Sequence, residues 1–183
     1  MDTNYPDNLG AYYRENPSLF EKRVDSKKRT INFVLAAVCV LLLIFPSIIP
    51  IGNTLVRIIA GVALLYFAFS VYSGGVDWYS IASGGKIKTF AIVKFNTTDE
   101  SDINRIKQMF EEGDFAGLAS EPAEQNHPLQ LYIDEDPTGN TFYLQLMYYF
   151  SSSDFSGTSD VKTVSEQQSP EDYRIIKGIK STG

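Results

Sequence analysis

Two long apolar runs constrain the fold of this chain more than any other feature. Ile31–Pro50 contains twenty consecutive uncharged residues, and Leu55–Tyr72 is nearly as long, with one charge at Arg57. An α-helix of twenty residues rises about 30 Å, which is the thickness of the hydrocarbon core of a bilayer. A tight turn around Pro50–Asn53 separates the runs. The pattern predicts a membrane α-helical hairpin of two transmembrane helices over residues 31–73.

The distribution of basic residues predicts the orientation of this hairpin. Lys and Arg resist translocation, whereas Asp and Glu have little influence. Five basic residues lie within ten positions before the first run, none lies in the connecting turn, and Lys86 and Lys88 follow the second run. We therefore expect an integral membrane protein with both termini cytoplasmic, in the plasma membrane or in the inner membrane if the source is bacterial.

Eight residues are predicted to act as membrane-interface anchors. Arg57 can extend its aliphatic stem toward the interface, and aromatic side chains with polar tips favour the same depth. The basic residues before the first run either bind anionic lipid or act only as a topology signal, and we favour the signal. The eight anchors are Lys22, Arg23, Lys27, Lys28, Arg29, Arg57, Trp78 and Tyr79.

Residues 1–30 form a predicted polar N-terminal arm with a basic amphipathic lead-in. Met1–Glu15 is expected to be disordered or loosely docked. Asn16 and Pro17 suit the start of a short helix whose apolar face carries Phe20, Val24 and Ile31. Residues 74–85 are a predicted Gly-rich juxtamembrane linker, in which two glycine pairs act as hinges around a connector that can rest on the membrane.

Residues 86–183 are predicted to form a cytoplasmic α+β domain. Lys86–Phe95 is rich in β-branched and aromatic residues, and Leu129–Asp134 alternates apolar with polar residues, so both are predicted strands. Thr97 and Glu100 fit a capping box before a helix that ends at Gly113, and a short helical turn follows. Thr141–Phe150 is apolar at odd and even positions, which predicts a central strand covered on both faces.

The remaining segments complete a small domain with a mainly antiparallel sheet. Asp136–Gly139 is a predicted turn with its left-handed position at Gly139, and it joins two strands as a hairpin. Ser151–Ser159 is a predicted loop and Val161–Val164 a possible strand. Ser169 and Pro170 then suit the start of a last helix. The order of elements favours helices packed on one face of the sheet.

Charge and cysteine content exclude several classes of function. Residues 76–183 carry nine basic and seventeen acidic residues, which disfavours binding to nucleic acid. Cys39, the single cysteine, lies in the first apolar run, so no disulfide or cysteine-based zinc site can form within one chain.

No catalytic, cofactor-binding or metal-binding constellation is predicted. His127 is the single histidine and lies in a proline-flanked loop with no partner placed beside it. Asp134–Asn140 resembles a calcium loop only superficially, because Gln145 stands where a bidentate Glu is required. Asn96–Thr98 matches a glycosylation sequon, which the predicted topology would keep on the cytoplasmic side.

Three functions remain open from the sequence. The first is a non-enzymatic protein-binding or scaffold module, tethered to the bilayer, that contacts a protein partner or another copy of itself. Aromatic residues of Thr141–Phe150 are possible interface residues, although such residues more often form a core. The second is a ligand-responsive membrane-tethered regulator. The third is an enzyme using carboxylates alone, drawn from Glu111, Glu112, Asp134 and Asp136.

Overall fold

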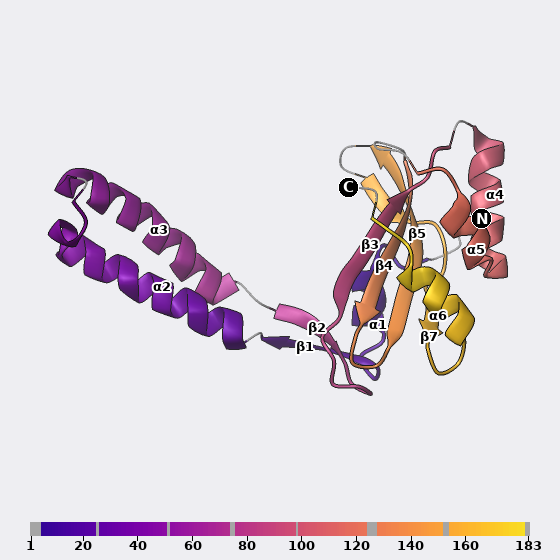
Figure 1. The fold of residues 1–183 in the computed structure, drawn as a ribbon, viewed down its shortest axis with the longest axis horizontal. Helices are drawn as coiled ribbons and strands as arrows, with labels where there is room; N and C mark the ends of the chain where they lie inside the picture. The colour runs from indigo at the N-terminus through magenta and orange to yellow at the C-terminus, as the bar shows by residue number, and fades with distance from the viewer. Residues whose placement is uncertain are drawn as a thin grey trace. The chain divides into compact units, whose positions relative to one another are not determined.

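The fold is described from a computed structural model of the chain, which describes residues 5–24, 26–50, 52–73, 76–97, 99–123, 128–151 and 154–181. The chain divides into two compact units. One unit contains residues 22–77, which we call the helical unit. The other combines residues 1–21 with residues 78–183, which we call the sheet unit. The ribbon in Figure 1 labels the elements of both.

The helical unit contains a pair of helices that pack against each other. Helix α2 covers Ser26–Ile44 and α3 covers Asn53–Ser73, with a short 3₁₀ turn, η1, at Pro46–Ile48 between them. Cys39 of α2 and Val56 and Ala60 of α3 are buried in this packing. The opposite faces of both helices are apolar and exposed, since their amphipathic character is weak.

One stretch of the described residues, Asn53–Val71 in α3, is long and apolar enough to cross a bilayer, and 11% of it is buried. The sequence predicts two such helices. The difference arises because α2 begins at Ser26 rather than at Ile31, so its first turns include Lys27, Lys28 and Arg29. The uncharged part of α2, from Thr30 to Ile44, is about 22 Å long.

The sheet unit is built on a five-stranded sheet in which every described pairing is antiparallel. The strands are β3 (Lys88–Lys94), β4 (Leu129–Asp136), β5 (Thr141–Ser151), β6 (Asp154–Gly157) and β7 (Lys162–Ser165). Their order is β3-β4-β5-β6, and β7 pairs with the first half of β5 on the same edge as β6. This confirms the predicted α+β class with a mainly antiparallel sheet.

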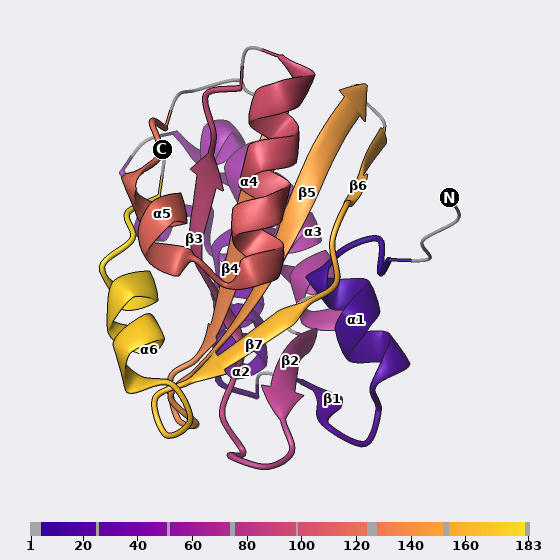
Figure 2. The ribbon, with the colours of Figure 1, turned by 90° about the vertical axis from the view of Figure 1, so that its right-hand side faces the viewer.

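Helices α4 (Glu100–Glu112), α5 (Phe115–Ser120) and α6 (Pro170–Lys177) cover one face of the sheet (Figure 2). Alternation places Leu131 and Ile133 of β4 beside Leu146 and Leu144 of β5 on that face. With Phe110 of α4 they belong to the main hydrophobic core. The burial of β5 from Phe142 to Met147 confirms that this strand is central and covered on both faces.

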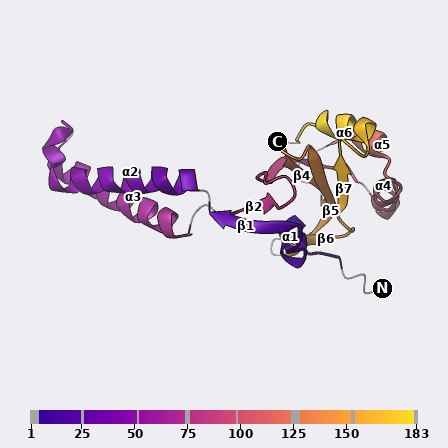
Figure 3. The ribbon, with the colours of Figure 1, turned by 90° about the horizontal axis from the view of Figure 1, so that it is seen from below.

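Helix α1 (Leu9–Glu15) covers the opposite face of the sheet (Figure 3). Leu9 and Tyr13 of α1 are buried with Phe20, Ile87 and Tyr143 in a second cluster, which we call the aromatic cluster. The ring centroid of Tyr13 lies 5.6 Å from that of Tyr143 and 5.8 Å from that of Trp78. Docking of α1 therefore uses specific side chains, contrary to the predicted disordered or loose arm.

The predicted amphipathic lead-in helix is wrong. Asn16 ends α1 by donating its backbone N–H to the Tyr12 carbonyl, and β1 (Phe20–Val24) follows a turn. Strand β1 pairs with β2 (Val76–Ser80) in a separate two-stranded sheet, so part of the predicted linker is also a strand. Aromatic residues such as those of this linker are common both in strands and at membrane interfaces. The sequence alone therefore does not distinguish a strand from an interfacial connector here.

Gly84 and Gly85 do not behave as the predicted hinge. Ser80 donates its N–H to the Gly85 carbonyl, and Gly84 donates to Ser80, which closes a tight turn. Gly85 is buried, and a Cβ there would lie 2.1 Å from a carboxylate oxygen of Asp136. The other predicted hinge, Gly74–Gly75, lies outside the described residues.

Three local predictions within the sheet unit also need correction. Asp99, rather than Thr97, caps α4 by accepting from the Asp102 N–H at 3.0 Å. Asn140, rather than Gly139, takes the left-handed position of the β4–β5 turn, with φ 46°. The predicted loop at residues 151–159 contains β6 because its backbone pairs with the end of β5, a long-range contact that its polar sequence does not encode.

Candidate functional site

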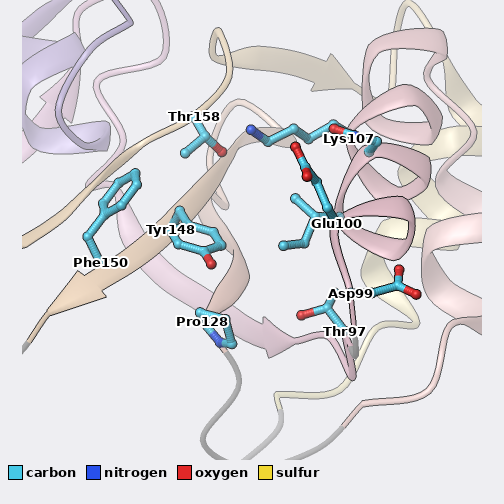
Figure 4. A pocket seen from close by; sticks show the side chains of 10 residues that line it. Thr97, Asp99, Glu100, Lys107, Pro128, Tyr148, Phe150 and Thr158 are labelled. Atoms are coloured by element: carbon cyan, nitrogen blue, oxygen red, sulfur yellow. The ribbon is translucent and has the colours of Figure 1, made fainter.

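The candidate site is a groove of about 620 Å³ between the start of α4 and the end of β5, which we call the α4–β5 groove. Tyr148 and Phe150 of β5 form one side, and Glu100 and Lys107 of α4 lie on the other (Figure 4). Pro128, immediately before β4, contributes to the lining. The volume lies within the usual range for sites that hold a side chain or a small ligand.

Local hydrogen bonding fixes both walls of the groove. The cap at Asp99 sets where α4 begins, and Ile106 and Phe110 hold the helix against the core. On the other wall, the Tyr149 N–H donates to the Pro128 carbonyl at 2.9 Å. The end of β5 is therefore hydrogen-bonded to the residue that immediately precedes β4. The groove is therefore pre-formed by regular elements rather than by a loop.

Exposed aromatic side chains distinguish the β5 wall. Phe150 is 59% exposed and Tyr149 is 44% exposed, and these are the large exposed aromatic residues in the described part of the sheet unit. The ring centroids of Tyr148 and Phe150 lie 4.7 Å apart, so Phe150 extends an apolar surface that begins in the groove. Rigid aromatic side chains of this kind are enriched where proteins bind other proteins.

The rim of the groove is polar and carries both signs of charge. Asp99, Glu100 and Lys107 lie on or beside α4, and Thr158 lies beyond β6. An apolar floor with a mixed polar rim is typical of a docking surface for a protein segment. The described lining contains no histidine or cysteine.

The predicted membrane-interface residues fall on four elements. Lys22 and Arg23 are exposed on β1, Lys27, Lys28 and Arg29 are exposed in the first turns of α2, and Arg57 is exposed on α3. Trp78 and Tyr79 lie on β2 and are half-buried. Because Trp78 packs against the aromatic cluster, its indole already has a protein environment.

The four carboxylates considered for an enzyme do not share one site. Glu111 and Glu112 are exposed at the C-terminal end of α4. Asp136 is buried and accepts hydrogen bonds from Ser83 Oγ at 2.5 Å and from the Gly139 N–H at 3.0 Å. Asp134 accepts from the Tyr13 hydroxyl at 2.9 Å. Each aspartate thus has a structural role that the sequence analysis missed.

Burial alters the acidity of the groups around Asp134. Desolvation raises the pKa of the Asp134 carboxyl, although hydrogen bonds from Tyr13 and Thr89 oppose the rise. Desolvation and the nearby Asp134 charge raise the pKa of the Tyr13 phenol well above its usual range. Desolvation and the Asp136 charge raise the pKa of Tyr143 to about 12. Both phenols are therefore neutral at physiological pH, and that of Tyr13 acts as a donor.

Within the described ranges, no group of three or more histidine, cysteine, aspartate or glutamate residues lies close enough to hold a metal ion. His127 lies outside those ranges, as does Thr98 of the possible glycosylation sequon.

A local signal for the docking of α1 is present in the sequence. Asn8 accepts from the Ala11 N–H at 2.9 Å as an N-cap, and Leu9, Tyr12 and Tyr13 have helical spacing. No such signal marks Phe150, because the sequence does not show which end of β5 extends beyond its neighbours.

Comparison with protein-family models, with curated proteins and with solved structures finds no match for this chain.

Proposed function

We propose that this protein is a two-pass integral membrane protein whose sheet unit is a non-enzymatic docking module for a protein partner. The single observation that supports docking most directly is the pre-formed α4–β5 groove with the exposed Phe150 at its edge. Neither feature is required by the core, which is complete on both faces of the sheet.

The membrane part of the proposal rests on the outward faces of α2 and α3. Side chains such as Phe33, Val62 and Leu65 are 65%, 66% and 73% exposed. Soluble monomers rarely expose continuous apolar patches larger than a few hundred Å². Helix α3 is 21 residues long, or about 31 Å, which matches the hydrocarbon core.

Helix α2 is proposed as the second pass because it packs along α3 and because η1 extends its apolar stretch. Its basic first turns would lie at the interface, on the side that Lys and Arg favour. In this arrangement both termini and the sheet unit face the cytoplasm. If α2 instead lay along the membrane interface, η1 would not be accessible from the side of the membrane that the two-pass arrangement predicts.

Labelling with a membrane-impermeant maleimide tests the topology. In a Cys39→Ser background, a cysteine replaces Ser47 of η1 or Ser18 of the α1–β1 turn, both of which are exposed. We expect the Ser47→Cys variant to react in intact cells and the Ser18→Cys variant to react only after permeabilisation. Equal reactivity of the two variants would contradict the two-pass topology.

Site-specific photo-crosslinking in native membranes tests docking. A photoreactive residue at Phe150 is expected to give one reproducible adduct, whereas the same residue at the exposed Glu171 of α6 serves as the matched control. A Lys107→Glu change across the groove should weaken the Phe150 adduct without changing the thermal stability of the protein. Recovery of the protein without an adduct at Phe150 would exclude the groove as the docking surface.

A further inference from the structure

A second cavity of about 670 Å³ lies in the sheet unit, among the α1–β1 turn, the β2–β3 loop, the β4–β5 turn and the β7–α6 turn. We call it the hydroxyl pocket. Fifteen residues line it, and Asp136 alone among them carries a formal charge. Such a lining is unusual for a chain in which 21% of residues are charged.

The one carboxylate of the hydroxyl pocket is already engaged. Asp136 is 1% exposed and accepts hydrogen bonds from Ser83 Oγ and from the backbone N–H groups of Thr138 and Gly139. A cationic ligand would therefore compete with three internal donors. An anionic ligand would find no lysine, arginine or histidine in the lining. The electrostatics select a neutral ligand.

Polar side chains that can bind such a ligand are abundant. Thr163 of β7 and Gln167 and Gln168 of the following turn line the pocket and are exposed. Their side chains make no hydrogen bond with the described part of the protein. Each amide offers two donors and an acceptor, and each hydroxyl offers both functions. This mixed set matches a ligand that itself carries hydroxyl groups.

An aromatic wall completes the hydroxyl pocket. Phe20 and Tyr143 are 3% and 7% exposed, and their ring centroids lie 5.3 Å apart. Tyr12 lies beside them, 5.7 Å from Phe20 between centroids. These rings are held by the aromatic cluster, so the wall keeps its shape without a ligand. The planes of Phe20 and Tyr143 are 78° apart and both rings are buried, so the half-buried ring of Tyr12 is the accessible apolar surface for the C–H face of a ligand ring.

We infer that the hydroxyl pocket binds a neutral polyhydroxylated ring, either a free sugar or the sugar headgroup of a lipid. The ring face lies against Tyr12, which Phe20 supports from behind, and the hydroxyl groups bond to the Thr and Gln side chains. This activity is separate from docking at the α4–β5 groove, because the two cavities share no lining residue.

Saturation-transfer NMR with maltose as the probe tests this inference. The full chain is placed in phosphatidylcholine nanodiscs, since maltoside detergents would themselves present the probe. We expect saturation transfer to the ring C–H protons of maltose. Gln168→Ala is expected to weaken maltose binding about 2- to 10-fold, the cost of one neutral hydrogen bond. Gln108→Ala, on the exposed face of α4, is the matched control and should bind as the native chain does.

Filling the pocket gives a second test that does not depend on one hydrogen bond. Thr163→Trp should abolish transfer to maltose while the thermal unfolding midpoint stays close to that of the native chain, because Thr163 is exposed on β7. Undiminished transfer in this variant, or no transfer from the native chain to maltose or to a glucosyl diacylglycerol, would overturn the inference.

Adding glucosyl diacylglycerol to the nanodiscs distinguishes the two sources of the ring. Loss of maltose transfer in the native chain would assign the pocket to a lipid headgroup, and persistent transfer would assign it to a free sugar. Either result would support the inferred ligand chemistry.

Discussion

At the scale of single residues, the contact between Tyr13 and Asp134 connects α1 to the sheet. The Tyr13 ring is 1% exposed, and its hydroxyl donates to a carboxylate across 121 residues of sequence. Asp134 is half-buried, and a carboxylate partly removed from water costs free energy unless it is hydrogen-bonded, so this donor does more than fill space. The aromatic ring and the hydroxyl contribute to stability through different mechanisms.

Removing the hydroxyl alone separates these contributions. Tyr13→Phe is expected to lower the free energy of unfolding by about 1–3 kcal/mol, because Asp134 loses a buried donor. For a chain of this length, each kcal/mol corresponds to about 2–4 °C in the unfolding midpoint. Fluorescence of Trp78, the single tryptophan, reports the transition, since it packs beside Tyr13.

The matched control for this variant is Tyr12→Phe. The Tyr12 side chain is half-buried and its hydroxyl makes no hydrogen bond with the described residues. Equal shifts of the unfolding midpoint in the two variants would show that the Tyr13 hydroxyl contributes nothing specific.

The raised pKa of Asp134 predicts a pH dependence. The folded state holds the Asp134 carboxyl proton more tightly than the unfolded chain does. The protonated carboxyl therefore adds to the free energy of unfolding, and this addition is fully present below the unfolded pKa of about 3.9. It is lost as the pH rises through the raised folded pKa. Asp134→Asn removes the charge, so its unfolding midpoint should rise relative to that of the native chain between acidic and neutral pH. Parallel pH profiles would contradict this sign, and Asp160→Asn, at an exposed position, is the control.

At the scale of elements, local sequence predicted the regular parts of the sheet unit well. Strands β3, β4 and β5 and helices α4, α5 and α6 were expected within a few residues of their observed bounds. Each has a strong period, or a stop such as Gly113 at φ 77°. Helix α1 and strands β1, β2 and β6 were missed because each is short and is stabilised by partners far along the chain. Their patterns are too brief to decide between helix, strand and loop.

A polar clamp also holds the segment before α1. Gln145 of β5 is fully buried, and its Nε2 donates to the Pro6 carbonyl at 2.7 Å and to the Ser159 carbonyl at 3.3 Å. Gln145→Leu should leave the Pro6 carbonyl without this donor and weaken the docking of α1. We expect faster hydrogen exchange across residues 5–16 than in the native chain, with little change in α4.

A control for the clamp is Gln130→Leu, at a half-buried position of the neighbouring strand β4. If hydrogen exchange in α1 is the same in the two variants, Gln145 does not hold the N-terminal segment.

At the scale of the whole molecule, the sequence suggested the wrong boundary for the part that contains the five-stranded sheet. The apolar runs divide the chain into successive segments, so residues 86–183 appeared to be the domain. The observed sheet unit is discontinuous and includes residues 1–21. The helical unit is inserted between the two parts of the sheet unit. Periodicity detects elements, but it does not detect which distant segments share a core.

This discontinuity predicts how the sheet unit can be isolated. The Ile81 N–H donates to the Leu19 carbonyl at 2.9 Å, so the two segments of the unit are close where the helical unit leaves and returns. Replacing residues 22–77 with a short Gly-Ser linker should therefore give a soluble, folded protein. Residues 86–183 alone lack α1, Phe20 and Trp78, so Tyr143 and the rest of that sheet face lose their cover.

The two shortened proteins should differ sharply in solution. We expect the linked protein to be monodisperse with dispersed amide resonances and cooperative unfolding, and residues 86–183 to aggregate or to unfold without cooperativity. Both proteins lack α2 and α3 and therefore the exposed apolar surface of these helices. The two proteins differ in whether α1, Phe20 and Trp78 cover the second face of the sheet. Equal behaviour would show that α1 and the aromatic cluster are dispensable and that the sheet is stabilised by α4, α5 and α6 alone.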